Sequence, residues 1–208
     1  MPSETTISTI RHARTSYNAE RRYAGTLDVS LSEAGICDAR TAAAKLAGLT
    51  FDVVITSALK RSIETARILV GDTTPFVVSK LCNERNFGIM EGLTWDEVHA
   101  LEPPVLFIEV GNDTHSVNPK GGEPFEDVWA RAEKFRRFIF REFKGASVLV
   151  VSHGVFLQMF HGVLRGLSCI EALAVYPANL ELARFQFAGQ RLVEEKAFKL
   201  GEAEEIRW

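Results

Sequence analysis

The sequence is poor in cysteine and has no long apolar run. Its 208 residues contain three cysteines, Cys37, Cys82 and Cys169, an odd number without the paired spacing of a disulfide framework or a zinc site. No apolar segment approaches the roughly 20 residues that a membrane-spanning helix needs. The N-terminus lacks the basic region and apolar core of a signal peptide. These absences predict reduced thiols, no metal ligand set and a cytoplasmic location.

The sequence also lacks an excess of either charge sign. The formal net charge is -3, with 25% charged and 46% hydrophobic residues, which is ordinary for a folded protein. A chain this close to neutral has no general attraction for nucleic acid or for an anionic membrane, so we expect neither as a partner. The length predicts one domain over residues 1–208. The sequence leaves the oligomeric state open between monomer and homodimer.

Short apolar segments alternate with segments of helical periodicity. The predicted strands are residues 5–10, 52–57, 75–79 and 147–151. The predicted helices are residues 31–46, 59–70, 125–143 and 155–164. Because a strand, a helix and another strand in succession pair in parallel through right-handed crossovers, these segments predict a mostly parallel sheet.

The last part of the chain has a different pattern. Residues 180–187 and 191–198 flank the turn sequence Ala188-Gly189-Gln190, which predicts an antiparallel hairpin at a sheet edge. Residues 88–124 contain most of the prolines, so we expect an excursion that helps to wall a pocket. The predicted fold class is therefore α/β: a single-domain three-layer sandwich with a mostly parallel central sheet, helices on both faces and an antiparallel C-terminal edge.

Basic side chains and histidines follow the predicted central strands. The first strand ends at Arg11 and His12, the second leads to Arg61 in the first turn of a helix, and the strand at 147–151 leads to His153. Ligands of open α/β sheets bind at the carboxyl ends of the strands. Guanidinium groups match the oxygens of a phosphoryl group, and imidazole can act as a nucleophile near neutral pH. The sequence therefore predicts a site for a phosphate dianion at this rim.

These residues stand in motifs that resemble a known family. Residues 11–18 (RHARTSYN) and 23–35 (YAGTLDVSLSEAG) resemble the N-terminal signature of the histidine phosphatase (phosphoglycerate mutase-like) superfamily. Residues 57–66 (SALKRSIETA) are similar to its second-arginine motif and residues 81–92 (LCNERNFGIMEG) to its acid motif. Ser152-His153-Gly154 is similar to its second-histidine motif, and Gly121-Gly122-Glu123 also has a counterpart in many members. The resemblance spans residues 7–187, and four motifs in the right order are a specific signal.

The resemblance implies a role for each matched residue. His12 would be the nucleophile that forms a phosphohistidine, and Glu84 would protonate the leaving oxygen and then accept a proton from water. Arg11, Arg61 and His153 would stabilise charge on the phosphoryl group without a metal ion or another cofactor. The matched positions that would contact the substrate are Asn18, Thr15, Ala24, Gly25, Arg85, Asn86 and Gly154.

One residue departs from the family pattern, and four further cations have no role in it. Ala13 stands where most members have glycine, so a positive φ there would strain the loop. Four further cations, Arg14, Arg21, Arg22 and Lys120, either raise the potential around the pocket or are ordinary exposed loop charges, and the sequence leaves both readings open.

Each residue also has an ordinary structural explanation. Taken singly, Arg61 and Glu84 would be surface charges, and Ser57 and Ser152 are predicted to cap their helices. His99, His115 and His161 are expected to be surface or hydrogen-bonded core residues, and Phe125, Trp129 and Phe135 to be a core stripe.

Three functions are consistent with the motifs. The first is a metal-independent phosphomonoester hydrolase acting on small phosphorylated metabolites. The short stretch of residues 87–152, and Asn86 and Phe87 where the mutases usually have histidine and tyrosine, favour this function. The second is a 2,3-bisphosphoglycerate-dependent phosphoglycerate mutase. The third is an inactive phospholigand-binding module, against which the complete set of His12, Arg11, Arg61, Glu84 and His153 speaks.

Overall fold

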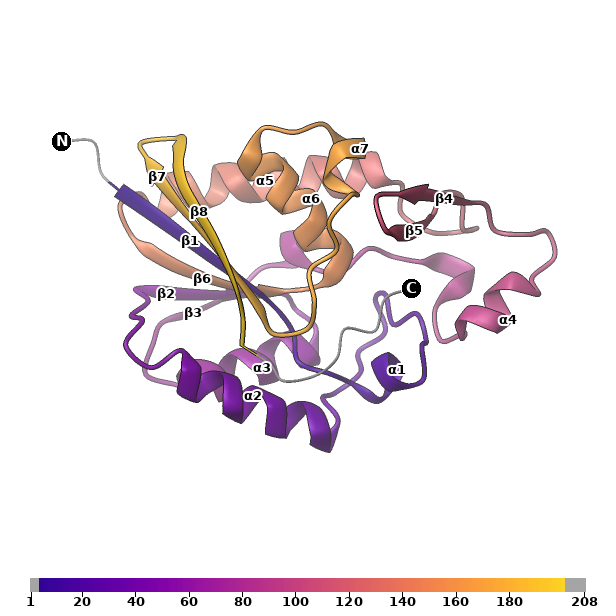
Figure 1. The fold of residues 1–208 in the computed structure, drawn as a ribbon, viewed down its shortest axis with the longest axis horizontal. Helices are drawn as coiled ribbons and strands as arrows, with labels where there is room; N and C mark the ends of the chain where they lie inside the picture. Colours follow the sequence, from indigo (N-terminus) through magenta and orange to yellow (C-terminus); the bar gives the residue numbers. More distant parts are fainter. Residues whose placement is uncertain (1–3, 201–208) are drawn as a thin grey trace.

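A six-stranded sheet crosses the centre of the protein in the computed structural model, which describes residues 4–200 (Figure 1). The strand order is β3-β2-β6-β1-β7-β8. The strands are β1 (Glu4–Arg11), β2 (Val53–Thr56), β3 (Phe76–Val78), β6 (Ser147–Ser152), β7 (Glu181–Ala188) and β8 (Arg191–Lys199). The first four pair in parallel, and β7 and β8 pair antiparallel at one edge. The α/β fold class predicted from the sequence is confirmed.

The central strands are apolar because helices cover both of their faces. On one face α5 (Phe125–Glu142) and α6 (Gly154–Arg165) pack on alternate residues such as Ile7, Ile55 and Val148. The opposite face is covered by α2 (Glu33–Lys45) and α3 (Lys60–Val70), as Figure 1 shows. Strands buried on both sides read as continuous apolar runs rather than as an alternating pattern.

The predicted elements begin and end within two residues of the observed ones, but the segment between α3 and α5 has more structure than expected. It contains the 3₁₀ turns η1 (Lys80–Cys82) and η2 (Gly88–Met90), helix α4 (Trp95–His99) and the two-stranded hairpin of β4 (Phe107–Val110) and β5 (Asp113–Ser116). The remaining short helices are α1 (Ser16–Ala19) and α7 (Cys169–Ala172). The hairpin is the part of the excursion that reaches the pocket.

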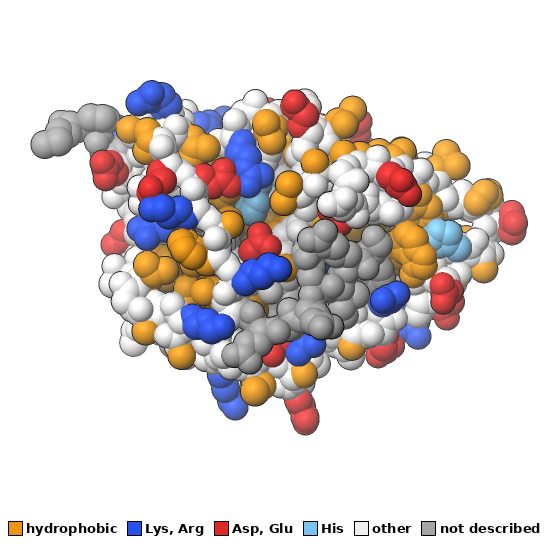
Figure 2. All heavy atoms as spheres, viewed as in Figure 1, with side chains coloured by type: hydrophobic (Ala, Val, Ile, Leu, Met, Phe, Trp, Pro, Cys, Tyr) orange, Lys and Arg blue, Asp and Glu red, His pale blue; other side chains and the backbone are white. Residues whose placement is uncertain are grey.

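Basic and acidic side chains are interspersed on the face shown in Figure 2, as expected from the near-neutral net charge. Among residues 4–200, no helix combines the length and apolar character that crossing a membrane requires. The assignment of residues 1–208 to one domain stays a prediction, because residues 1–3 and 201–208 lie outside the described part of the chain.

Candidate active site

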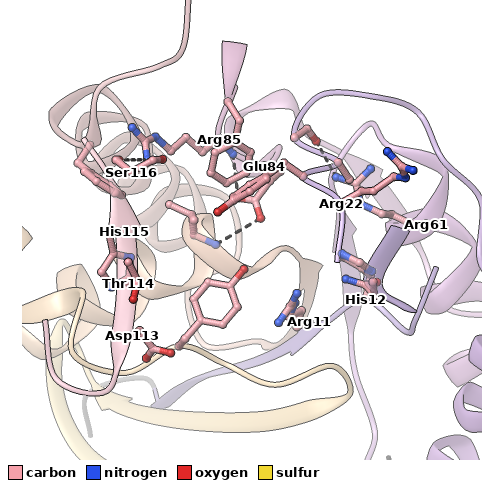
Figure 3. Close-up of a pocket in the computed structure, with 18 residues that line it drawn as sticks. Arg11, His12, Arg22, Arg61, Glu84, Arg85, Asp113, Thr114, His115 and Ser116 are labelled. Atoms are coloured by element: carbon pink, nitrogen blue, oxygen red, sulfur yellow. Dashed lines mark hydrogen bonds between the residues drawn. The ribbon is translucent and has the colours of Figure 1, made fainter. Parts of the chain in front are cut away.

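A pocket opens at the carboxyl ends of the parallel strands (Figure 3). The strand ends and the loops after them bring eight of the twelve site residues predicted from the sequence to its lining. These are Arg11, His12, Asn18, Ala24, Gly25, Arg61, Glu84 and Arg85. The other four, Thr15, Asn86, His153 and Gly154, lie outside the lining. The pocket therefore forms where the topology of the sheet places it.

His12 is held in one tautomer. Its Nδ1 lies 2.7 Å from the carbonyl oxygen of Ala13. Because a carbonyl oxygen only accepts hydrogen bonds, Nδ1 carries the proton and Nε2 carries a free lone pair. Burial, followed by the charges of Arg61 and Arg11, lowers the pKa of His12 well below its ordinary value. The ring is therefore neutral near pH 7, with an unprotonated nitrogen available as a nucleophile.

The backbone of His12 is fixed on both sides. Its amide donates to the carbonyl oxygen of Ser152 on β6, at 2.9 Å, and its carbonyl oxygen accepts the side-chain amide of Asn179, at 2.6 Å. Asn179 precedes β7, so strands on both sides of β1 locate the residue. Sequence analysis did not single out Asn179, because a lone asparagine in a loop has no pattern of its own.

Arg11 and Arg61 are both buried beside His12. Arg11 donates from Nη1 to the carbonyl oxygen of Pro177 at 3.0 Å. Arg61 donates to the carbonyl oxygens of Gly25 at 2.7 Å and Leu27 at 2.8 Å, and burial lowers its pKa to about 10. Neither guanidinium forms an ion pair with a carboxylate within the described residues. Both therefore lack a direct carboxylate partner and can turn to an anionic ligand.

Three buried nitrogen atoms of this cluster have no hydrogen-bond partner among residues 4–200. They are Nε of Arg11, Nε of Arg61 and Nδ1 of His153. Buried polar groups are almost always paired in native proteins, so a group of unpaired ones around one residue calls for an explanation. An anion bound beside His12 would supply acceptors for such donors.

His153 lies behind His12 rather than in the pocket lining. The centres of the two rings are 5.2 Å apart. Nε2 of His153 lies 2.7 Å from Oγ of Ser57, and that oxygen also accepts the amide of Leu59 at 3.2 Å. If the hydroxyl of Ser57 donates to Nε2, its oxygen still accepts from Leu59, and the proton of the neutral His153 ring lies on Nδ1. Burial, together with Arg61, lowers the pKa of His153 well below its ordinary value.

The two serines do not cap helices as the sequence predicts. The N-cap position of α3 is Leu59 and that of α6 is His153, and neither cap has a side-chain hydrogen bond. The hydroxyl of Ser152 instead donates to the carbonyl oxygen of Cys82 at 2.7 Å. Both predicted caps are wrong because each serine stands before the N-cap residue: Ser152 is the last residue of β6, and Ser57 directly follows β2.

The carboxylate of Glu84 lies at the N-terminus of α6. Its oxygens accept the amides of Arg85 at 2.8 Å, Phe156 at 3.1 Å and Val155 at 3.3 Å. The N-terminus of α6 and these three amide donors hold the carboxyl group in one orientation. Glu84 is 7% exposed and reaches the pocket that also exposes His12 (Figure 3). A carboxyl group and an imidazole with an unprotonated nitrogen thus share one cavity.

Asn18 and Thr15 form one unit at α1. Oδ1 of Asn18 accepts the amide and the hydroxyl of Thr15, each at 3.0 Å, and the hydroxyl oxygen of Thr15 accepts the amide of Asn18. Because this capping box directs Oδ1 toward Thr15, the side-chain nitrogen Nδ2 of Asn18 points away from Thr15. Asn18 lines the pocket and Thr15 does not. The structure therefore gives Thr15 the function of orienting Asn18.

The predicted small residues have steric reasons for their identity. A side chain at Gly25 would lie 2.0 Å from Oε1 of Glu91, and the φ of Gly25 is +49°. A side chain at Gly154 would lie 1.9 Å from the hydroxyl of Tyr176. Asn86 closes a turn by accepting the amide of Gly88 at 2.7 Å.

Ala13 is not strained. In the described part of the chain, the non-glycine residues with positive φ are Arg21 and Leu180, so Ala13 has ordinary backbone geometry. It is fully buried, its amide donates to the hydroxyl of Thr65 at 3.0 Å, and its carbonyl oxygen orients His12. The alanine is therefore accommodated at this position.

The four additional cations are distributed unevenly. Arg14 pairs with Asp38 at 2.7 Å and does not reach the pocket. Arg21 and Lys120 are exposed. Only Arg22 lines the pocket, and it pairs with Glu20 at 2.7 Å and Glu97 at 3.1 Å. The charges of Arg14 and Arg22 are thus largely compensated by neighbouring carboxylates.

Several lining residues were not expected from the sequence. They are Tyr23, Phe87, Asp113, Thr114, His115, Ser116, Phe125, Val155 and Tyr176. Tyr176 covers the guanidinium of Arg11, with Cζ 4.8 Å from the ring centre, and burial raises the pKa of its hydroxyl to about 12. His115 and Phe125 combine core packing with a place in the lining. Tyr23 and Phe87 stand in the family motifs but were not expected to line the pocket, and no motif marks the others, which only long-range folding brings there.

Comparison with known proteins agrees with this geometry. A model of the histidine phosphatase superfamily (branch 1) matches residues 7–198. A protein named 2,3-bisphosphoglycerate-dependent phosphoglycerate mutase, from Methylobacterium sp. (strain 4-46), is 32% identical over 166 residues, which cover 76% of this chain and 79% of that protein.

Two solved structures share the fold. The alpha-ribazole phosphatase from Shigella flexneri has a TM-score of 0.81 at 21% identity and covers 97% of this chain and 100% of that one. A phosphoserine phosphatase mutant from Entamoeba histolytica, in complex with phosphoserine, has a TM-score of 0.74 at 21% identity, covering 91% of this chain and 94% of that one.

Proposed function

The chain belongs to the histidine phosphatase superfamily, and on this premise we propose that it is a metal-independent hydrolase of small phosphomonoesters. The observation that carries the proposal is the state of His12. Its Nε2 has a free lone pair, its ring is neutral near pH 7, and two guanidinium groups without a direct carboxylate partner lie beside it. Phosphoryl transfer to a side chain requires a nucleophile and positive charge in this combination.

The reaction proposed has two displacements. In the first, Nε2 of His12 bonds to phosphorus, the ester bond to the leaving oxygen breaks, and Glu84 gives that oxygen a proton. In the second, water bonds to phosphorus, the bond to Nε2 breaks, and Glu84 takes the proton that water releases. Arg11, Arg61 and Nδ1 of His153 would stabilise the charge on the phosphoryl oxygens in both steps.

A phosphoglycerate mutase is a second candidate, and the sequence relatives favour it. The curated relative from Methylobacterium carries that name, and the coverage of the two proteins shows that they have similar lengths. The short stretch of residues 87–152 therefore does not separate the two functions. Phe87 speaks for hydrolysis, because it presents an apolar ring to the pocket where a tyrosine would offer a hydroxyl to a second anion.

The test is phosphate release by the chelator-treated protein from a panel of phosphomonoesters. In parallel, 3-phosphoglycerate with 2,3-bisphosphoglycerate is assayed for isomerisation. Release without added metal is the expected result. Isomerisation without release would identify a mutase, and absence of both reactions would leave a phospholigand-binding module.

A cytoplasmic location is part of the proposal. Its support is that Cys37, Cys82 and Cys169 are all free, as reduced thiols are in a reducing compartment. Burial raises the pKa of the Cys82 thiol, so that cysteine is unreactive rather than a competing nucleophile.

A further inference from the structure

The pocket wall that faces the catalytic cluster comes from the β4–β5 hairpin. Asp113, Thr114, His115 and Ser116 follow one another along β5 and lie across the pocket from His12 and Arg61 (Figure 3). A phosphoryl group bound at His12 would direct the rest of the ester into the remaining pocket. The chemistry of this wall therefore bears on which alcohol the ester contains.

Asp113 brings a carboxylate that no cation compensates. Its side chain lines the pocket, and within residues 4–200 it forms no ion pair and no hydrogen bond. Its negative charge contributes, after burial, to the raised pKa of Tyr176, so the two groups lie close together. An unpaired carboxylate in a pocket attracts hydrogen-bond donors and positive charge, and repels a second anion.

His115 brings an acceptor nitrogen to the same wall. Its Nε2 lies 3.0 Å from the carbonyl oxygen of Leu173, so Nε2 carries the proton and Nδ1 keeps its lone pair. Nδ1 has no hydrogen-bond partner among the described residues, and the ring lines the pocket. Burial lowers the pKa of His115, which keeps the ring neutral at physiological pH.

The two cations on this side of the pocket are already engaged. Arg22 pairs with Glu20 and Glu97. Arg85 donates to the carbonyl oxygens of Glu123 at 2.7 Å and Ser116 at 2.8 Å, and its guanidinium lies 3.9 Å from the ring centre of Phe125. Nη2 of Arg85 is buried and has no hydrogen-bond partner among the described residues. On β5 itself, the unengaged charged and imidazole groups are acceptors, the carboxylate of Asp113 and Nδ1 of His115.

We propose that the β5 wall, through Asp113 and His115, selects esters whose alcohol carries hydrogen-bond donors, hydroxyl or ammonium, and disfavours a carboxylate or second phosphate. This proposal rests on the proposed hydrolase function and names its substrate class. It also separates hydrolysis from the mutase reaction, whose substrates carry a carboxylate. Specificity here comes from repulsion of the wrong group as well as attraction of the right one.

The test uses two esters that differ at one end group. Glycerol 3-phosphate ends in CH₂OH where 3-phosphoglycerate ends in a carboxylate. The expected kcat/KM of the wild-type protein is at least about tenfold higher for glycerol 3-phosphate. Asp113→Asn should lower this preference several-fold by improving the reaction of 3-phosphoglycerate. His115→Phe, which removes the acceptor nitrogen while Gln158 still donates to the carbonyl oxygen of Leu173, should weaken glycerol 3-phosphate instead.

The matched control is Glu109→Gln, which removes a charge from the same hairpin outside the pocket lining. It should leave the ratio of the two esters at the wild-type value. A wild-type preference for 3-phosphoglycerate would overturn the proposal, and so would an Asp113→Asn ratio that moves no further than that of Glu109→Gln.

Two further measurements separate this proposal from the hydrolase function. Hydrolysis of p-nitrophenyl phosphate, whose alcohol carries no donor, reports the hydrolase function by itself. The melting temperature of the His12→Ala protein with each of the two esters ranks their binding without turnover. If no ester is hydrolysed, the hydrolase proposal fails. Equal or greater stabilisation by 3-phosphoglycerate would still overturn the selection by Asp113 and His115.

Discussion

The rings of His12 and His153 lie 5.2 Å apart, inclined by 56°, and burial together with the charge of Arg61 lowers the pKa of both. Burial and the two shared cations, Arg61 and Arg11, thus keep both imidazoles neutral. For His12 the neutral ring leaves an unprotonated nitrogen, and for His153 it is a donor or an acceptor depending on which nitrogen holds the proton. The carbonyl oxygen of Ala13 fixes the tautomer of His12, whereas that of His153 depends on the hydroxyl of Ser57, which gives each ring its own testable consequence.

Replacement of His12 by alanine should abolish turnover. The variant loses the nitrogen that forms the phosphohistidine, so kcat for any ester should fall by roughly a thousandfold or more. Quenching of the wild-type protein during turnover with an alkaline denaturant should trap phosphate that is stable to base and labile to acid, and the variant should trap none. Retained hydrolysis in a normally folded variant would remove His12 as the nucleophile.

Replacement of Glu84 by glutamine should make the rate depend on the leaving group. Alkyl phosphates need protonation of the leaving oxygen and should slow by roughly 100-fold or more, whereas p-nitrophenyl phosphate should slow far less. The glutamine amide would also face one of the α6 amides that now donate to the carboxylate. A melting curve therefore accompanies the kinetics, and equal slowing of both esters would exclude Glu84 as the acid.

Replacement of Ser57 by alanine should leave the tautomer of His153 unconstrained. Without the hydroxyl, nothing directs the proton to Nδ1, and kcat should fall by about tenfold while KM changes little. Ser57→Thr keeps the hydroxyl and should restore most of the rate. If alanine and threonine behave alike, the hydroxyl does not set the state of His153.

Acidification should destabilise the protein partly through His161. This residue is buried, its Nε2 lies 2.7 Å from the hydroxyl of Thr9, and burial lowers its pKa to about 3. Between pH 3 and the unfolded pKa near 6.5, the unfolded chain binds a proton that the folded protein does not. The free energy of unfolding should therefore decrease as the pH is lowered through this range, by at most about 1.4 kcal/mol per pH unit from this group.

The matched variant for that window is His161→Gln, which keeps a hydrogen-bonding amide near Thr9 and does not titrate. Its unfolding free energy, measured with denaturant from neutral pH to about pH 4, should depend less steeply on pH than that of the wild-type protein. Parallel pH profiles would show that His161 does not contribute to acid sensitivity.

The sequence was sufficient for the sheet and for the residues at its strand ends. Strands buried on both faces and helices with an apolar stripe produce strong periodic patterns, and the motifs around His12, Arg61 and Glu84 have few alternative explanations. The β4–β5 hairpin was missed because its strands are four residues long and their pattern is mostly exposed. Tyr176 was missed because its contact with Arg11 joins residues that only the folded sheet brings together.

Gly154 and Tyr176 also restrict which substitutions this site can accept. Any side chain at position 154 would overlap the phenol ring, at 1.9 Å from the hydroxyl oxygen and 2.2 Å from Cζ. The two positions are therefore sterically coupled, and a larger residue at 154 requires a smaller residue at 176. Because the same ring covers Arg11, such an exchange would also change the surroundings of the Arg11 guanidinium in the pocket. Single-site libraries at either position would not find that route.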